Sequence, residues 1–152
     1  MTISLGFSPC PNDTFIFDAM VNGLIDTGKL KFNVMMEDVQ TLNEWAMAGK
    51  LDCTKISYGV YPLVQEQYQL LESGGALGTG VGPLLISRQP IALEDIPKLR
   101  IAKKEKNTTA HLLFSMAFPL AQHKEFLVFN SIEQAVLDGR VDAGVIIHEN
   151  RF

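Results

Sequence analysis

The chain has 152 residues, of which 47% are hydrophobic and 20% are charged, and its formal net charge at pH 7 is −4. This is an ordinary globular composition, and a chain of this length buries about 68 to 70% of its unfolded surface without needing a metal or a disulfide staple. The acidic balance lacks the clustered positive charge that binds phosphate backbones, so we expect no nucleic-acid partner.

The two cysteines and the first residues of the chain indicate the cellular compartment in which the protein is expected. Cys10 and Cys53 have neither CxxC spacing nor the density of a disulfide scaffold, so the sequence predicts reduced thiols. The first residues contain no basic segment followed by a long apolar run. No stretch approaches the roughly 18 apolar residues of a membrane span. We therefore expect a cytoplasmic protein that does not enter a membrane.

Alternating apolar patterns predict strands and helices in turn along the chain. The predicted strands cover residues 3–7, 30–36, 51–57, 84–87, 99–102 and 126–129 and the residues after Asp142. The predicted helices begin after the loop at residues 8–12, at Thr41, at Thr108 and at Ser131. This alternation predicts an α/β fold with mostly parallel sheets.

An internal repeat relates residues 41–57 to residues 131–147, at an offset of 90. Each copy has a hydroxyl residue that could cap a helix, an apolar helix face, then Gly, a cation, an aliphatic residue, Asp and a strand. Two copies in one order predict two similar lobes. The glycine-rich residues 74–83 lie between the copies, so we expect a first lobe at 1–83 and a second at 84–152. Because no helix is predicted directly after these glycines, they do not indicate a phosphate-binding loop.

Polar residues gather where the predicted strands end, and ligands of open parallel sheets bind outside the carboxyl ends of the strands. These residues are Ser8 to Thr14, Lys55 to Tyr58, Asn107 to Thr109, and His148. They are the candidate site residues.

The candidates allow more than one role. His148 follows an apolar run, and a neutral imidazole is the usual proton acceptor, although a hydrogen-bonded structural histidine is the alternative. Thr108 and Thr109 either cap a helix or bind a carboxylate. Ser57 lacks the GxSxG elbow of a nucleophile, which favours a hydrogen-bonding role. Lys55 either pairs with an anionic ligand or is solvated.

Other polar residues receive structural interpretations. Asn12 and Asp13 are expected to start the first helix, and residues 103–106 (KKEK) are expected to be a solvated surface run. His111 falls inside a predicted helix and His123 in a polar connection. With no close cluster of His, Cys or carboxylate residues, we predict no metal site.

Four segments resemble the 1,4-dihydroxy-6-naphthoate synthases of the futalosine route to menaquinone. They are SPCPNDTFIF at 8–17, KIS at 55–57, NTTA at 107–110 and HENRF at 148–152. The resemblance implies a two-lobed, type II periplasmic-binding-protein-like fold that closes on its ligand by hinge motion. It also implies a cytoplasmic, cofactor-independent lyase that acts on cyclic dehypoxanthinyl futalosine.

The resemblance assigns roles to single residues. His148 matches the catalytic histidine, which accepts a proton from the substrate. The residues that match contacts to a small carboxylated substrate are Lys55, Ile56, Ser57, Asn107, Thr108 and Thr109. The sequence does not distinguish Asn107 from Thr109 as the more important substrate contact.

Members of this family are longer than this chain. The resemblance therefore implies further chain that completes the second lobe and returns to the first, and it predicts that these 152 residues alone are inactive or only weakly active. A solute-binding or sensor domain of the same fold is an alternative function. A chorismate dehydratase is a third, which the SPCPND opening disfavours. The oligomeric state is left open.

Overall fold

The computed structural model describes residues 1–80, 82–104 and 106–147, with residues 129 and 130 described by their backbone alone. The chain divides after Leu77 into two compact units, each an α/β arrangement of helices on a sheet. The predicted fold class is therefore confirmed. The expected lobe boundary between residues 83 and 84 lies a little further along the same glycine-rich stretch.

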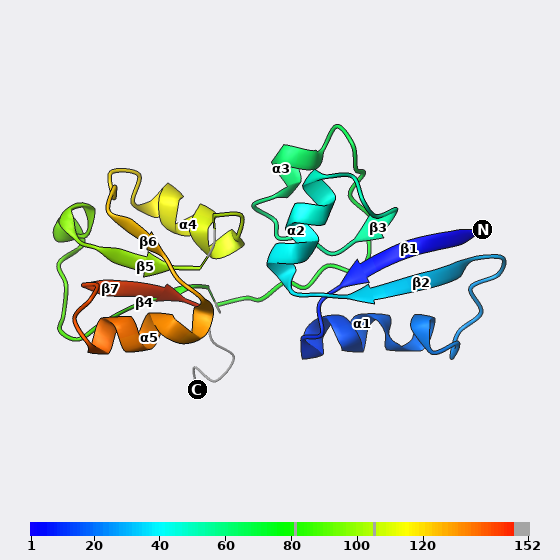
Figure 1. The fold of residues 1–152 in the computed structure, drawn as a ribbon, viewed down its shortest axis with the longest axis horizontal. Helices are drawn as coiled ribbons and strands as arrows, with labels where there is room; N and C mark the ends of the chain where they lie inside the picture. Colours follow the sequence, from blue (N-terminus) through cyan, green and yellow to red (C-terminus); the bar gives the residue numbers. More distant parts are fainter. Residues whose placement is uncertain (81, 105, 148–152) are drawn as a thin grey trace. The chain divides into compact units, whose positions relative to one another are not determined.

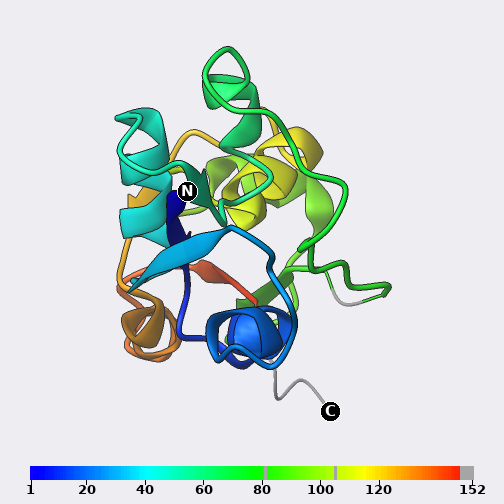
Figure 2. The same ribbon diagram turned by 90° about the vertical axis from the view of Figure 1, so that its right-hand side faces the viewer.

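The N-terminal unit contains a three-stranded parallel sheet in the order β2-β1-β3. Its strands are β1 (Thr2–Phe7), β2 (Lys31–Met36) and β3 (Cys53–Thr54). Its helices are α1 (Pro11–Val21), α2 (Val39–Met47) and the short α3 (Tyr61–Val64). Figures 1 and 2 show α1 and α2 on opposite faces of the sheet. The connection through α1 leads from β1 to β2 on one side, and the connection through α2 leads back past β1 to β3 on the other, so two right-handed crossovers place their helices on opposite faces.

The C-terminal unit contains a four-stranded sheet in the order β4-β7-β5-β6. Its elements are β4 (Leu84–Ser87), the 3₁₀ helix η1 (Leu93–Lys98), β5 (Ile101–Lys103), α4 (Thr109–Ala117), β6 (Lys124–Phe126), α5 (Phe129–Leu137) and β7 (Ala143–Ile146). β5 runs parallel to β6 and β7, and β4 is an antiparallel edge strand. α4 and α5 cover opposite faces of this sheet (Figure 1), each over its own apolar cluster.

The two units repeat one β-α-β-α-β arrangement, and the internal repeat of the sequence is part of it. The bounds of α5 and the first residue of β7 are those of α2 and β3 plus 90. Asp52 Oδ2 accepts the backbone N–H of Ser4, and Asp142 Oδ2 accepts that of Arg100, both at 2.8 Å. Each aspartate directly precedes one strand and ties it to the N-terminal part of the neighbouring strand in the sheet.

The predicted bounds of four elements are wrong. α2 begins before Thr41 because Asp38 is its N-cap, and the Asp38 carboxylate accepts the backbone N–H groups of Gln40 and Thr41. α5 likewise begins at Phe129 rather than Ser131. The strand predicted over 126–129 is β6, which covers Lys124–Phe126 instead. The strand predicted over 51–57 is only two residues long. The apolar pattern marks the middle of an element, whereas the cap residue decides where it begins.

Candidate functional site

The topology of each unit identifies where a ligand would bind. In the N-terminal sheet the strand order reverses between β1 and β3, and in the C-terminal sheet it reverses between β5 and β7. Ligands of doubly wound sheets bind outside the carboxyl ends of the strands at such a switch point. The residues there are the SPCPND segment and Lys55 to Ser57 in the first unit, and Lys103 and the start of α4 in the second.

A buried ion pair organises the switch point of the N-terminal unit. Asp13, in the first turn of α1, is only 5% exposed. Its Oδ2 accepts the backbone N–H of Ser8 at 3.0 Å and the Ser8 hydroxyl at 2.8 Å, and its Oδ1 lies 3.2 Å from Lys55 Nζ. A carboxylate at this depth needs such partners, because an unpaired buried charge is costly.

Lys55 is held by the fold rather than solvated. Besides its pairing with Asp13, its Nζ donates a hydrogen bond to the carbonyl oxygen of Gly74 at 2.9 Å. An ammonium has three N–H donors, so one donor is left for a ligand. The Lys55 side chain keeps 19% of its surface exposed.

A second polar contact orients Ser57. Asn43, on α2, is fully buried; its Oδ1 accepts the backbone N–H of Ser57 at 2.9 Å, and its Nδ2 donates to Ser57 Oγ at 3.2 Å. Because the amide is the donor in the second bond, the Ser57 hydroxyl retains its own proton for an acceptor. Ile56 packs against the apolar cluster of Ala46, Val60 and Val64, so only its backbone is suited to a polar ligand.

The expected site residues of the C-terminal unit surround the start of α4. Thr108 is the N-cap, 7% exposed, and its Oγ1 accepts the backbone N–H of His111 at 3.2 Å. Thr109 is the first residue of α4, and Asn107 precedes the cap; both are half-buried. Backbone N–H groups in the first turn of a helix have no partner within the helix and attract anions.

The interpretation of residues 103–106 as a solvated run is wrong for Lys103. Lys103 is 1% exposed. It lies in β5 between Val145 of β7 and Phe126 of β6, and its side chain lies against Phe114 of α4. Its Nζ lies 5.0 Å from the centre of the Phe114 ring and 5.6 Å from that of Phe126. Burial, reinforced by the ammonium of Lys124, lowers the pKa of Lys103 to about 8.

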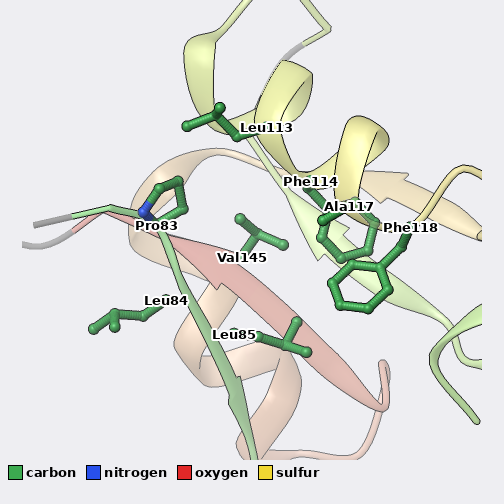
Figure 3. A pocket seen from close by; sticks show the side chains of 8 residues that line it. All are labelled: Pro83, Leu84, Leu85, Leu113, Phe114, Ala117, Phe118 and Val145. Carbon is green, nitrogen blue, oxygen red and sulfur yellow. The ribbon is translucent and has the colours of Figure 1, made fainter. Parts of the chain in front are cut away.

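An apolar pocket of about 190 Å³ also lies in the C-terminal unit, between α4 and the strands β4 and β7 (Figure 3). It is lined by Pro83, Leu84, Leu85, Leu113, Phe114, Ala117, Phe118 and Val145. None of the expected site residues lines it. A pocket with only apolar side chains has nothing to orient a polar substrate, so we do not assign the substrate to it.

The chain was compared with models of known protein families. Residues 3–152 match the family model described as menaquinone biosynthesis. The chain belongs to the menaquinone biosynthesis family. The resemblance seen in the sequence is thereby confirmed.

Two curated relatives are named 1,4-dihydroxy-6-naphthoate synthase. The Thermus thermophilus protein is 46% identical over 150 residues, and the Streptomyces coelicolor protein is 40% identical over 156 residues. Each alignment covers 99% of this chain and 54% of the relative. The chain therefore spans about half the length of the curated relatives it matches.

Solved structures are similar to this member of the menaquinone biosynthesis family in fold. A crystal structure of an Archaeoglobus fulgidus protein is 35% identical with a TM-score of 0.87, covering 99% of this chain and 55% of that one. The periplasmic aliphatic sulphonate binding protein of Escherichia coli is 16% identical with a TM-score of 0.60, covering 97% and 54%. The second likeness concerns the fold alone, and it agrees with the predicted periplasmic-binding-protein-like architecture.

The structure thus brings together the expected residues of each unit separately. Lys55 and Ser57 lie at one switch point with Asp13 and Asn43. The sequence analysis placed Asp13 among the polar residues at a strand end but interpreted it as a helix-starting residue, and it did not select Asn43. His148 lies outside the described residues. Within residues 1–80, 82–104 and 106–147, no three His, Cys, Asp or Glu side chains are grouped to hold a metal ion. No helix in the same ranges is long and apolar enough to cross a membrane.

Proposed function

We propose that this chain forms part of a two-lobed lyase that converts cyclic dehypoxanthinyl futalosine to 1,4-dihydroxy-6-naphthoate. The observation that carries the proposal is the 46% and 40% identity, over nearly the whole chain, to two proteins named 1,4-dihydroxy-6-naphthoate synthase. In this proposal the lobes at 1–83 and 84–152 close on the substrate by hinge motion. The reaction takes place in the cytoplasm, with a small carboxylated substrate and without nucleic acid.

The proposed substrate contacts follow from the donors at each switch point. Lys55 has one N–H to donate beyond its bonds to Asp13 and Gly74, and Ser57 has a hydroxyl held in place by Asn43. Ile56 contributes its backbone, since its side chain packs in the core.

In the second unit Asn107, Thr108 and Thr109 lie at the start of α4, whose first backbone N–H groups have no carbonyl partner within the helix. Backbone amides and hydroxyls in this arrangement favour a carboxylate. The Oγ1 of Thr108 accepts the N–H of His111, so as the N-cap Thr108 orders the first turn of α4 beside the proposed carboxylate.

His148 is the proposed proton acceptor. Its neutral imidazole takes a proton from the cyclic substrate, and the electron pair released drives expulsion of the sugar-derived portion and formation of the aromatic naphthoate. No cofactor is needed in this scheme, because the reaction involves proton transfer and bond cleavage rather than oxidation.

A chimera tests the proposal on this chain's own residues. The 152 residues would replace the matching part of the Thermus thermophilus relative, and the product would be incubated with cyclic dehypoxanthinyl futalosine and analysed by mass spectrometry. We expect the naphthoate from the chimera, and little or none from the 152 residues alone. Naphthoate formed by the isolated chain at the rate of the intact relative would refute the expected dependence on the additional length.

His148→Ala in the chimera identifies the base. We expect loss of turnover with retained substrate binding, whereas His123→Ala, which changes an exposed histidine, should leave turnover intact. Unchanged turnover in His148→Ala would remove His148 from the mechanism. Binding without any product in the unsubstituted chimera would favour the solute-binding alternative, and product formed from chorismate instead would favour a dehydratase.

A further inference from the structure

The repeat of the fold places Lys103 at a position that is apolar in the other unit. In the N-terminal sheet Phe7 pairs with Met36, and in the C-terminal sheet Lys103 pairs with Phe126, which is Met36 plus 90. Phe7 is 2% exposed and stacks on Phe17 of α1 at a centroid distance of 4.8 Å. The C-terminal unit therefore carries an ammonium group where the same architecture elsewhere carries an aromatic ring.

Two buried nitrogen atoms lack partners at this position. Among the described residues, neither Lys103 Nζ nor His111 Nδ1 has a hydrogen-bond partner. Lys103 Nζ faces the rings of Phe114 and Phe126, and the His111 ring stacks on Phe126 at a centroid distance of 5.7 Å. Contacts with ring faces recover only part of what an ammonium loses on leaving water.

The charged groups that affect these nitrogens are, among the described residues, all cationic. Lys124 comes from β6, with its Nζ 3.5 Å from Ser115 Oγ of α4, and Lys106, before α4, has its Nζ 5.7 Å from the centre of the Phe126 ring. β7 contributes the apolar Val145. Within the described part of the chain, Lys124 lowers the pKa of Lys103, and Lys103, Lys124 and Lys106 lower the pKa of His111. Among residues 82–104 and 106–147, these groups therefore gather positive charge around two nitrogen atoms that make no hydrogen bond.

We propose that Lys103, His111 and Lys124 form a binding site for a small oxyanion, a phosphate or a carboxylate, on the α4 side of β5. The anion accepts N–H bonds from the two ammonium groups and from the N–H of the His111 imidazole, which is neutral because burial and the neighbouring lysines lower its pKa, and it offsets the positive charge of the two lysines. Phe126, whose ring centre lies 5.6 Å from Lys103 Nζ, and Lys106 are both exposed, so the proposed route of entry is past these two side chains. Lys103 shares its switch point with the start of α4, but none of the three residues is among the proposed substrate contacts, so phosphate binding is tested without the lyase reaction.

Binding of inorganic phosphate to the 152-residue chain tests this site. The His111 ring resonances would be followed by NMR while phosphate replaces chloride at constant ionic strength. We expect saturable shifts, and in Lys103→Met an apparent Kd raised by about tenfold or more, because a charge-assisted hydrogen bond is lost. Lys29→Met, which removes an exposed lysine of the other unit, should behave like the parent chain.

The pH and the choice of anion provide two further tests of the proposed site. Affinity should fall as the pH rises above about 8, when Lys103 loses its proton. Acetate in place of phosphate separates the two sources: binding of acetate alone indicates a carboxylate site, binding of phosphate alone indicates a phosphate site, and saturable binding of both indicates a general oxyanion site. Equal titrations of the parent chain and Lys103→Met, or no saturable shift of His111 with either anion, would overturn the proposal.

Discussion

Lys103→Met is expected to stabilise the C-terminal unit. Burial, reinforced by the Lys124 ammonium, lowers the pKa of Lys103 from its usual 10.5 to about 8. Since one pKa unit corresponds to about 1.36 kcal/mol, the buried ammonium lowers the free energy of unfolding by about 3 kcal/mol at neutral pH. Methionine has a similar volume and no charge, so the substitution removes this penalty without creating a cavity.

The pH dependence of this effect has a defined sign. Below about pH 8 the amine is protonated in both the folded and the unfolded state, and the full penalty applies. Between about pH 8 and 10.5 only the unfolded state keeps the proton, so the free energy of unfolding of the parent chain rises with pH. Lys103→Met lacks that rise, and its advantage over the parent therefore disappears across this window.

Urea denaturation in a chloride buffer measures the effect with an internal control. Circular dichroism follows both units, whereas the fluorescence of Trp45, the single tryptophan, follows α2 of the N-terminal unit. We expect the Trp45 transition to be the same in the parent and Lys103→Met. Equal stability of the two proteins at pH 7, with parallel pH profiles up to 10.5, would refute the reasoning that an unpaired ammonium is buried in β5.

Two further substitutions probe the packing of each unit. Asp13→Ala leaves the Ser8 amide and the Lys55 ammonium without their carboxylate, so the free energy of unfolding should fall by about 3 kcal/mol in denaturation followed by Trp45 fluorescence. In Gly144→Ala the added Cβ would lie 2.5 Å from Ile132 Cγ2, and we expect a loss of about 1–3 kcal/mol in denaturation followed by circular dichroism.

Matched controls accompany both substitutions. Asp18→Ala removes an exposed carboxylate from the same helix as Asp13, and Gly82→Ala adds a Cβ that meets nothing within 4 Å. Both should change the stability by less than about 0.5 kcal/mol. A loss in Asp18→Ala as large as that in Asp13→Ala would mean that the buried pair is not what stabilises the N-terminal unit. Full stability of Gly144→Ala would contradict the close packing of α5 on β7.

The fold was predictable as far as local patterns reach. Thr108 caps α4 because a capping hydroxyl acts on backbone groups within the next few residues, and those groups are visible in the sequence. The same reasoning was wrong at Thr41, because Asp38 competes for the first turn of α2 and captures the Thr41 hydroxyl as well, at 2.6 Å. A local pattern predicts a helix, but competition between neighbouring caps decides its first residue.

The candidate site was predictable in part. Lys55 and Ser57 were selected because they follow a predicted strand, but their partners come from other elements. Asp13 was interpreted as a helix-starting residue, and Asn43 falls within the predicted helix from Thr41 to Gly49. A signal for Asn43 was present: it follows Leu42 on a helix, where a polar residue beside an apolar stripe can be buried. No comparable local signal marks Asp13 as the partner of Lys55.

The sequence alone determined the alternation of the main strands and helices. It also determined the 90-residue repeat and, with it, the equivalence of Asp52 and Asp142. These features are encoded by residues that follow one another in the chain. The tertiary structure decided that Asp13 meets Lys55, that Asn43 orients Ser57, and that the first lysine of an apparently solvated run is buried. These outcomes depend on strand register and on which helix covers which face of a sheet. A pleated strand directs alternate residues to opposite faces, so the same lysine is solvated or buried according to the neighbours its strand acquires.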